Sequence, residues 1–108
     1  MEENKVLCGA NFYTQKYYFN EEFSMLPERV KEELQALCVL YVEDVGGALI
    51  LEFDAAGKLM FRVESEEGDC RFDEIGSGLK IRQIQRGQAG LLESLELFYK
   101  TFYLGTDA

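Results

Sequence analysis

Residues 48–64 read Ala-Leu-Ile-Leu-Glu-Phe-Asp-Ala-Ala-Gly-Lys-Leu-Met-Phe-Arg-Val-Glu, and this stretch decides the fold because it predicts a β-hairpin together with its register. A three-residue loop at 55–57 would use Gly57 as its left-handed residue and would place Asp54 opposite Lys58. Pairing outward from there gives an apolar face with the pairs Leu49–Val63, Leu51–Phe61 and Phe53–Leu59. The other face receives Ile50–Arg62 and Glu52–Met60. A slip of one residue would move these apolar side chains to the other face, so the turn and the alternation of apolar residues indicate the same register. We therefore expect Phe53 and Phe61 at the centre of the core.

The residues before this hairpin predict two short strands and a helix. Residues 5–19 are rich in Val, Leu, Phe and Tyr, and Gly9-Ala10-Asn11 is the expected turn between two strands. A helix is expected to begin between Ser24, as its cap, and Pro27, in its first turn. Apolar residues recur three and four apart, at Val30, Leu34, Leu37 and Tyr41. Residues 37–43 would also suit a strand, but the stripe stays in phase as far as Gly46, a natural C-terminal stop, which favours a helix.

The residues after the hairpin predict a turn at 65–69, a brief edge strand at 70–74 and a helix over 77–104. That helix would be roughly 40 Å long, too long for a domain with a radius of gyration near 13 Å, so Gly87 and Gly90 are the expected places for a bend or break. The element order predicts a single α+β domain over 1–108. We expect two layers, with an antiparallel sheet covered on one face by the helices.

Composition excludes several classes of function. Twenty acidic and eleven basic residues give a net charge of −9, which disfavours nucleic acid and anionic membranes as partners. The N-terminal residues are acidic, and no apolar run reaches the length of a signal-peptide core or a membrane span, so we expect a cytoplasmic protein. Histidine is absent, which excludes Ser-His-Asp and Cys-His catalysis. Cys8, Cys38 and Cys70 are far apart in the sequence and are expected to be reduced thiols in the core.

Two features suggest a binding site, although each has a simpler explanation. Gly76-Ser77-Gly78 at a helix start could present N–H groups to an anion, and Arg82 and Arg86, one turn apart, could hold an acidic ligand. The motif lacks the lysine of a phosphate-binding loop, so a flexible helix cap explains it better. The acidic residues of 64–74 match no calcium loop and are expected to form a solvated turn, with no metal site. No cofactor is expected.

The apolar side of the last helix is the strongest indication of function. Its residues exceed what one sheet contact covers, which predicts an exposed patch and self-association. The expected interface consists of Leu91, Leu95, Phe98, Tyr99 and Phe102. The sequence therefore favours a small, acidic, nonenzymatic protein-interaction module, a homodimer or a binder of another protein. The alternative is a small-molecule or anion-binding protein that uses the basic face and the glycine-bounded helix start.

Several short motifs, spread over most of the chain, resemble a small bacterial family of unknown function found mainly in Firmicutes. They are Gln15-Lys16-Tyr17-Tyr18, Leu26-Pro27, Glu43-Asp44-Val45-Gly46-Gly47, Asp73-Glu74-Ile75-Gly76-Ser77 and Leu91-Leu92-Glu93-Ser94-Leu95-Glu96. None of these motifs carries chemistry. The resemblance implies a cytosolic bacterial protein and transfers no catalytic residue.

Overall fold

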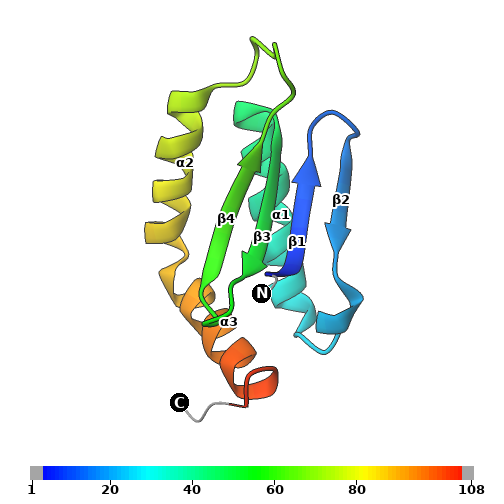
Figure 1. The fold of residues 1–108 in the computed structure, drawn as a ribbon, viewed down its shortest axis with the longest axis vertical. Coiled ribbons are helices and arrows are strands. Elements are labelled where there is room, and N and C mark those ends of the chain that lie inside the picture. Colours follow the sequence, from blue (N-terminus) through cyan, green and yellow to red (C-terminus); the bar gives the residue numbers. More distant parts are fainter. Residues whose placement is uncertain (1–3, 106–108) are drawn as a thin grey trace.

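The computed structural model describes residues 4–105, which form a four-stranded antiparallel sheet with helices on one side (Figure 1). The strands are β1 (Lys5–Asn11), β2 (Lys16–Phe19), β3 (Ala48–Phe53) and β4 (Leu59–Glu64), in the spatial order β2-β1-β3-β4. The helices are α1 (Glu28–Val45), α2 (Glu74–Gly87) and α3 (Ala89–Phe102), and a short 3-10 helix, η1 (Glu21–Phe23), precedes α1. The predicted α+β fold, with helices packed against an antiparallel sheet, is confirmed.

The β3–β4 hairpin has the predicted register at all of the pairs named above. The Asp54 N–H donates to the Lys58 carbonyl at 2.9 Å, and Gly57 has a φ of +86°, as the three-residue loop requires. Phe53 is wholly buried, whereas Phe61, on the edge strand, is only partly buried. Of the two phenylalanines expected at the centre of the core, only Phe53 lies there.

The first hairpin turns later than predicted, because Gly9-Ala10-Asn11 belongs to β1. The turn occupies residues 12–15, where Gln15 has a φ of +56°. The Asn11 side-chain oxygen accepts from the N–H groups of Tyr13 and Thr14 at 2.8 and 3.2 Å, which explains why the turn follows Asn11.

Helix α1 begins one residue after Pro27 and ends at Gly46, which confirms residues 37–43 as helix. Pro27 occupies the N-cap position, and the Gly46 N–H closes the last turn on the Val42 carbonyl at 2.8 Å. Ser24 does not cap this helix; it ends η1, with its N–H bonded to the Glu21 carbonyl. The buried residues of α1 recur three and four apart and face the sheet.

The C-terminal helix is broken, as predicted, but it starts earlier than predicted. Residues 70–73 form turn and irregular structure instead of an edge strand, and α2 begins at Glu74. Asp73 explains this start, because its side chain accepts a hydrogen bond from the Gly76 N–H at 2.9 Å. Gln88 both ends α2 and precedes α3, with a φ of −116° and a ψ of 25°. Each helix of 14 residues is about 21 Å long, which fits the molecule.

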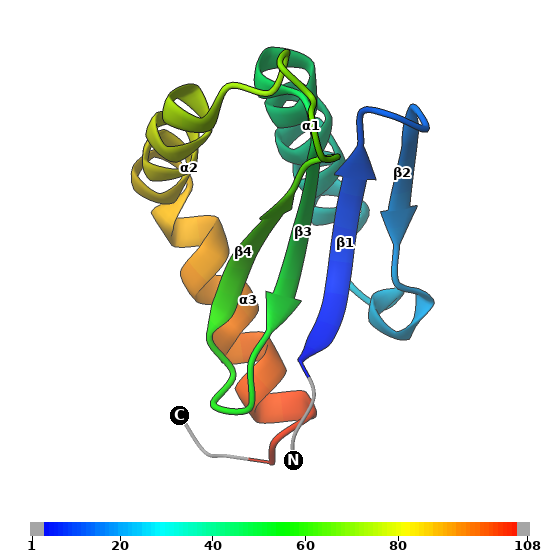
Figure 2. The same cartoon turned by 45° about the horizontal axis from the view of Figure 1, so that its top comes forward.

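The core lies between the sheet and helices α1 and α3, which lie behind the strands in Figure 2. The Phe53 ring stacks on Tyr99 of α3, with ring centroids 4.2 Å apart and an interplanar angle of 6°. The Sγ atoms of Cys8 on β1 and Cys38 on α1 lie 3.9 Å apart, and their hydrogen bond and burial raise the pKa of the Cys38 thiol. Both thiols are core residues as predicted. Cys70 is exposed in the loop before α2, so its predicted burial is wrong.

Candidate interaction surfaces

The predicted anion site lies inside the first turns of α2, where its backbone donors already have partners. The Gly76 N–H donates to the Asp73 carboxylate, and the Ser77 N–H donates to the Asp73 carbonyl at 2.8 Å. A Cβ on residue 76 would collide with the Asp73 carboxylate, so the glycine makes room for this cap. An external anion would therefore compete with a carboxylate that is part of the chain. Gly78 lies beyond the cap, in the helix.

Ser77 is buried and attaches α2 to the rest of the molecule. Its hydroxyl shares a hydrogen bond with the Tyr41 hydroxyl of α1. Burial raises the pKa of Tyr41, and the bond to Ser77 acts in the opposite direction. The Lys80 ammonium pairs with Asp44 of α1 at 2.7 Å, close to the same junction. Ser77 is therefore a packing residue, so it is not available to a ligand.

Arg82 and Arg86 are exposed, and two large apolar side chains share their face of α2. The exposed fraction is 79% for Ile75 and 59% for Leu79. At about 100° per residue, these four residues fall within roughly 60° of one another, on the side of the helix opposite Ser77. We call this set the outward face of α2. Sequence reasoning found its two arginines and missed its two apolar residues, although the spacing of four, three and four was a usable signal.

The residues of the predicted interface on α3 differ in how far they are exposed. Leu95 and Tyr99 are buried in the core of the single chain, where they pack against the sheet. Leu91 and Phe98 are partly buried and pack against the core. Phe102 is 69% exposed and is the one member of the set that lies freely at the surface. The apolar side of α3 therefore covers the sheet, as a core helix does.

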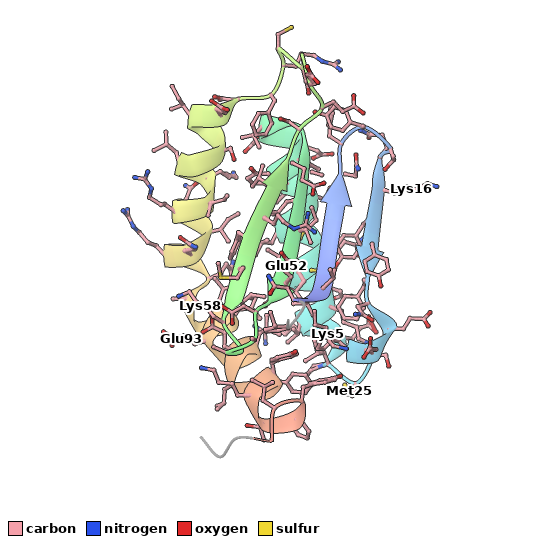
Figure 3. All side chains as sticks on the ribbon, viewed as in Figure 1. Lys5, Lys16, Met25, Glu52, Lys58 and Glu93 are labelled. Carbon is pink, nitrogen blue, oxygen red and sulfur yellow. The ribbon has the colours of Figure 1, made fainter. Side chains whose placement is uncertain are left out.

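The sheet face opposite the helices carries a groove of about 620 Å³ that sequence reasoning did not predict. Side chains of all four strands line it, among them Tyr18, Ile50 and Arg62, and Gly9 lies in its floor. Glu52 is on this face and is only 7% exposed, because the Arg62 Nε donates to its carboxylate at 3.0 Å. Figure 3 shows Glu52 over the middle of the sheet and Lys16 reaching outward from β2. We call this surface the open face.

Tyr13 connects the first hairpin to the acidic loop before α2. Its hydroxyl donates to the Asp69 carboxylate at 2.5 Å and accepts from the Glu66 N–H at 3.0 Å. The bond holds the pKa of Asp69 below its usual range and raises the pKa of Tyr13. The side chain of Arg71 lies over the Phe12 ring, 5.8 Å from its centroid. These contacts order the loop, and their sequence separation of more than fifty residues explains why no pattern revealed them.

Across residues 4–105, no three His, Cys, Asp or Glu side chains converge as a group that could hold a metal ion. In the same part of the chain, no helix combines the length and the hydropathy needed to cross a membrane.

Comparison with known proteins yields a family and no activity. No curated protein and no solved structure matches the chain. A family model matches residues 4–107, which is nearly the whole length, and is described as a family of unknown function. The chain therefore belongs to the family of unknown function DUF6145.

Proposed function

We propose that this protein is a nonenzymatic, cytoplasmic protein-interaction module that binds a helix of another protein on the outward face of α2. The observation that carries the proposal is the exposure of Ile75 and Leu79 beside Arg82 and Arg86. A surface helix normally turns its apolar side chains toward the core and its polar side chains toward water. Helix α2 does this with Ile81 and Ile84, yet places two further aliphatic side chains on the opposite side.

The charges on α2 indicate the chemistry of the partner. Within the described residues, Lys80 is paired with Asp44, whereas no ion pair involves Arg82 or Arg86. An arginine fork binds carboxylates in a bidentate manner. The partner that fits is an amphipathic helix with apolar residues three and four apart, flanked at one end by Glu or Asp. Such a helix would cover Ile75 and Leu79 and pair with the two arginines.

The alternative, binding of a small anion, is less well supported by the geometry. The helix N-terminus is capped by Asp73, and Arg82 lies eight residues after Glu74, the first residue of α2, which is about 12 Å along the axis. These groups do not converge on one ligand. The absence of histidine from the sequence also favours the nonenzymatic proposal, because the usual general base near neutral pH is missing.

A photo-crosslinking amino acid in place of Leu79 tests this proposal in cells of the source organism. Leu97, which is 49% exposed on α3, is the matched control position. We expect a discrete adduct with another protein from position 79 but not from position 97, and we expect Arg82→Glu with Arg86→Glu to abolish it. A synthetic Leu/Glu amphipathic helical peptide should compete with the adduct, and its Leu/Lys counterpart should not.

Three outcomes would contradict the proposal. They are equal adducts from both positions, an adduct that survives reversal of both arginine charges, and an adduct formed only with another copy of this chain.

A further inference from the structure

The open face has a pattern of residues that is complementary to itself. Strand register places side chains in rows across the four strands, because opposite residues of neighbouring strands lie side by side. One row is Tyr18, Gly9, Ile50 and Arg62, and the next is Lys16, Asn11, Ala48 and Glu64. In each row the outer residues are large and the inner positions include a small one. This arrangement leaves the middle of the face, over β1 and β3, lower than its edges, and the groove is lined by residues of both rows.

Gly9 gives the groove its depth. A Cβ at this position would lie 2.9 Å from the Leu49 carbonyl oxygen and 3.5 Å from the Ile50 side chain. Glycine is therefore required where β1 approaches β3, and the hollow left by its missing side chain belongs to the groove beside Ile50, which is partly exposed in the same row. The surface therefore carries both a projecting aliphatic side chain, Ile50, and a hollow that could accept one, at Gly9 on the neighbouring strand.

The edges of the face carry opposite charges. Lys16 on β2 makes no ion pair within the part of the chain that the structure describes, and Glu64 on β4 is 58% exposed on its side chain. The two residues are three strands apart, about 14 Å, so they do not pair within one molecule. Arg62 is bonded to Glu52 and Glu64, which fixes its guanidinium on this face.

We propose that two copies of the chain join through their open faces about a twofold axis that runs along the strands between β1 and β3. This axis places β2 of one copy over β4 of the other, and β1 over β3. Lys16 then lies opposite Glu64 of the second copy, Tyr18 lies opposite its Arg62, and Ile50 enters the hollow at its Gly9. The contacts are an ion pair, a cation–π contact and an apolar knob in a hole, and each occurs twice.

The rest of the fold permits this packing. Helices α1 and α3 pack on the other side of the sheet, and α2 packs against these two helices beside β4, so none of them covers the open face (Figures 1 and 2). Stacked sheets lie about 10 Å apart with their strands at about −30°, an angle that comes from the twist of each sheet. Lys16 points outward from the edge in one copy, and its flexible stem allows it to reach the second sheet. Repulsion between two copies of charge −9 is screened beyond about 8 Å at physiological salt.

The interface on the open face is separate from the outward face of α2, so this proposal goes beyond the proposed function and does not depend on it. A dimer would carry two α2 helices. It would therefore offer two docking sites to a partner.

Charge reversal tests the arrangement. The mass of the full-length protein is measured by sedimentation equilibrium over a range of concentrations. We expect the wild-type chain to form a dimer, and Lys16→Glu alone or Glu64→Lys alone to weaken it roughly tenfold or more, because each variant sets like charges opposite one another twice. Arg29→Glu, which changes the net charge by the same amount as Lys16→Glu at an exposed position of α1, should leave the dimer unchanged.

An equal mixture of the two single variants gives the sharpest result. In a dimer of one Lys16→Glu chain and one Glu64→Lys chain, both contacts again join opposite charges. The mixture should therefore form a heterodimer more tightly than either variant alone forms a homodimer, and circular dichroism should show that both variants are folded. A monomeric wild type at every concentration, single variants that dimerise as tightly as the wild type, or a mixture that associates no better than the single variants would each overturn the proposal. None of these results would affect crosslinking from position 79, which tests the α2 site alone.

Discussion

Replacing Phe53 or Phe61 with Ala should separate the two phenylalanines of the β3–β4 hairpin that the sequence alone treats as equals. Phe53 is wholly buried and stacks on Tyr99 at 4.2 Å, with the Phe23 ring centroid 5.7 Å away. Phe61 lies on the edge strand and is partly buried. Because both changes remove the same atoms, effects on the unfolded chain largely cancel in the comparison.

The expected magnitudes follow from burial and stacking. Removal of a buried Phe side chain costs about 3–5 kcal/mol, and loss of the aromatic stack places Phe53→Ala in the upper half of that range. Partial burial reduces the expected loss for Phe61→Ala to about 1–2 kcal/mol. A small domain has a stability of about 5–15 kcal/mol, so Phe53→Ala removes a large share of it. Phe53→Leu keeps most of the apolar volume and should lose about 1 kcal/mol.

Urea unfolding followed by circular dichroism at 222 nm measures these losses, and the chain has no tryptophan to serve as a fluorescence probe. A difference of about 2–4 kcal/mol between the two alanine variants corresponds to roughly 1–2 M in the urea midpoint, at an unchanged slope of about 2 kcal/mol/M. Equal losses in the free energy of unfolding, or a larger loss for Phe61→Ala, would show that burial at the helix-covered centre of the sheet does not contribute more to stability than burial on its edge strand. A changed slope would show that the comparison is not between equivalent unfolded states.

Three further predictions follow from individual contacts. Cys70 should react with a thiol reagent in the folded protein at the rate of an exposed cysteine while the two core thiols react only on unfolding, and native labelling that persists in Cys70→Ser would contradict this. The Tyr13 bond lowers the pKa of Asp69, so its stabilising effect is full above the unfolded value of about 3.9 and is lost as the pH falls through the lower folded value. Tyr13→Phe should therefore be less stable than wild type at pH 7 in thermal unfolding, and the gap should close in acid. Tyr41→Phe should cost about 1–3 kcal/mol because it leaves the buried Ser77 hydroxyl unpaired, and the double variant with Ser77→Ala should lose clearly less than the sum of the two single variants.

Local signals determined the parts of the fold that could be predicted from sequence. The β3–β4 register follows from a loop that needs Gly57 and from the alternation of apolar and polar side chains, which a shift of one residue in the strand pairing would destroy. Both signals lie within 17 residues of sequence. Helix α1 follows from an apolar stripe that ends at Gly46. The sequence also contained a local signal for the early start of α2, because Asp73 lies three residues before Gly76 and is a good N-cap. The glycines on either side of Ser77 favour a helix start near that residue, which hides the signal from Asp73.

The candidate surfaces were harder to predict, because periodicity shows which residues share a face and not which face is covered. Leu95 and Tyr99 belong to an apolar stripe that is compatible with a dimer interface. In the structure this stripe packs on the sheet and buries Phe53 and its neighbours. The groove of the open face depends on the pairing of Gly9 with Tyr18 and Ile50. That pairing requires β1 to lie between β2 and β3, a fact of topology that neither hairpin reveals alone. The Tyr13–Asp69 contact likewise depends on the complete fold.

The attachment of α2 through Ser77 has a consequence for hydrogen exchange. Ser77 is the buried residue of this helix, whereas α1 buries six residues. A helix anchored in this way can open while the sheet and α1 stay folded, because little apolar surface is exposed when it detaches. Amide protons of α2 should therefore exchange through a local opening of lower free energy than global unfolding, and those of α1 should exchange only when the whole chain unfolds. The molecule then consists of a stable unit, formed by the sheet with α1, and a more labile helix that carries its own exposed apolar residues.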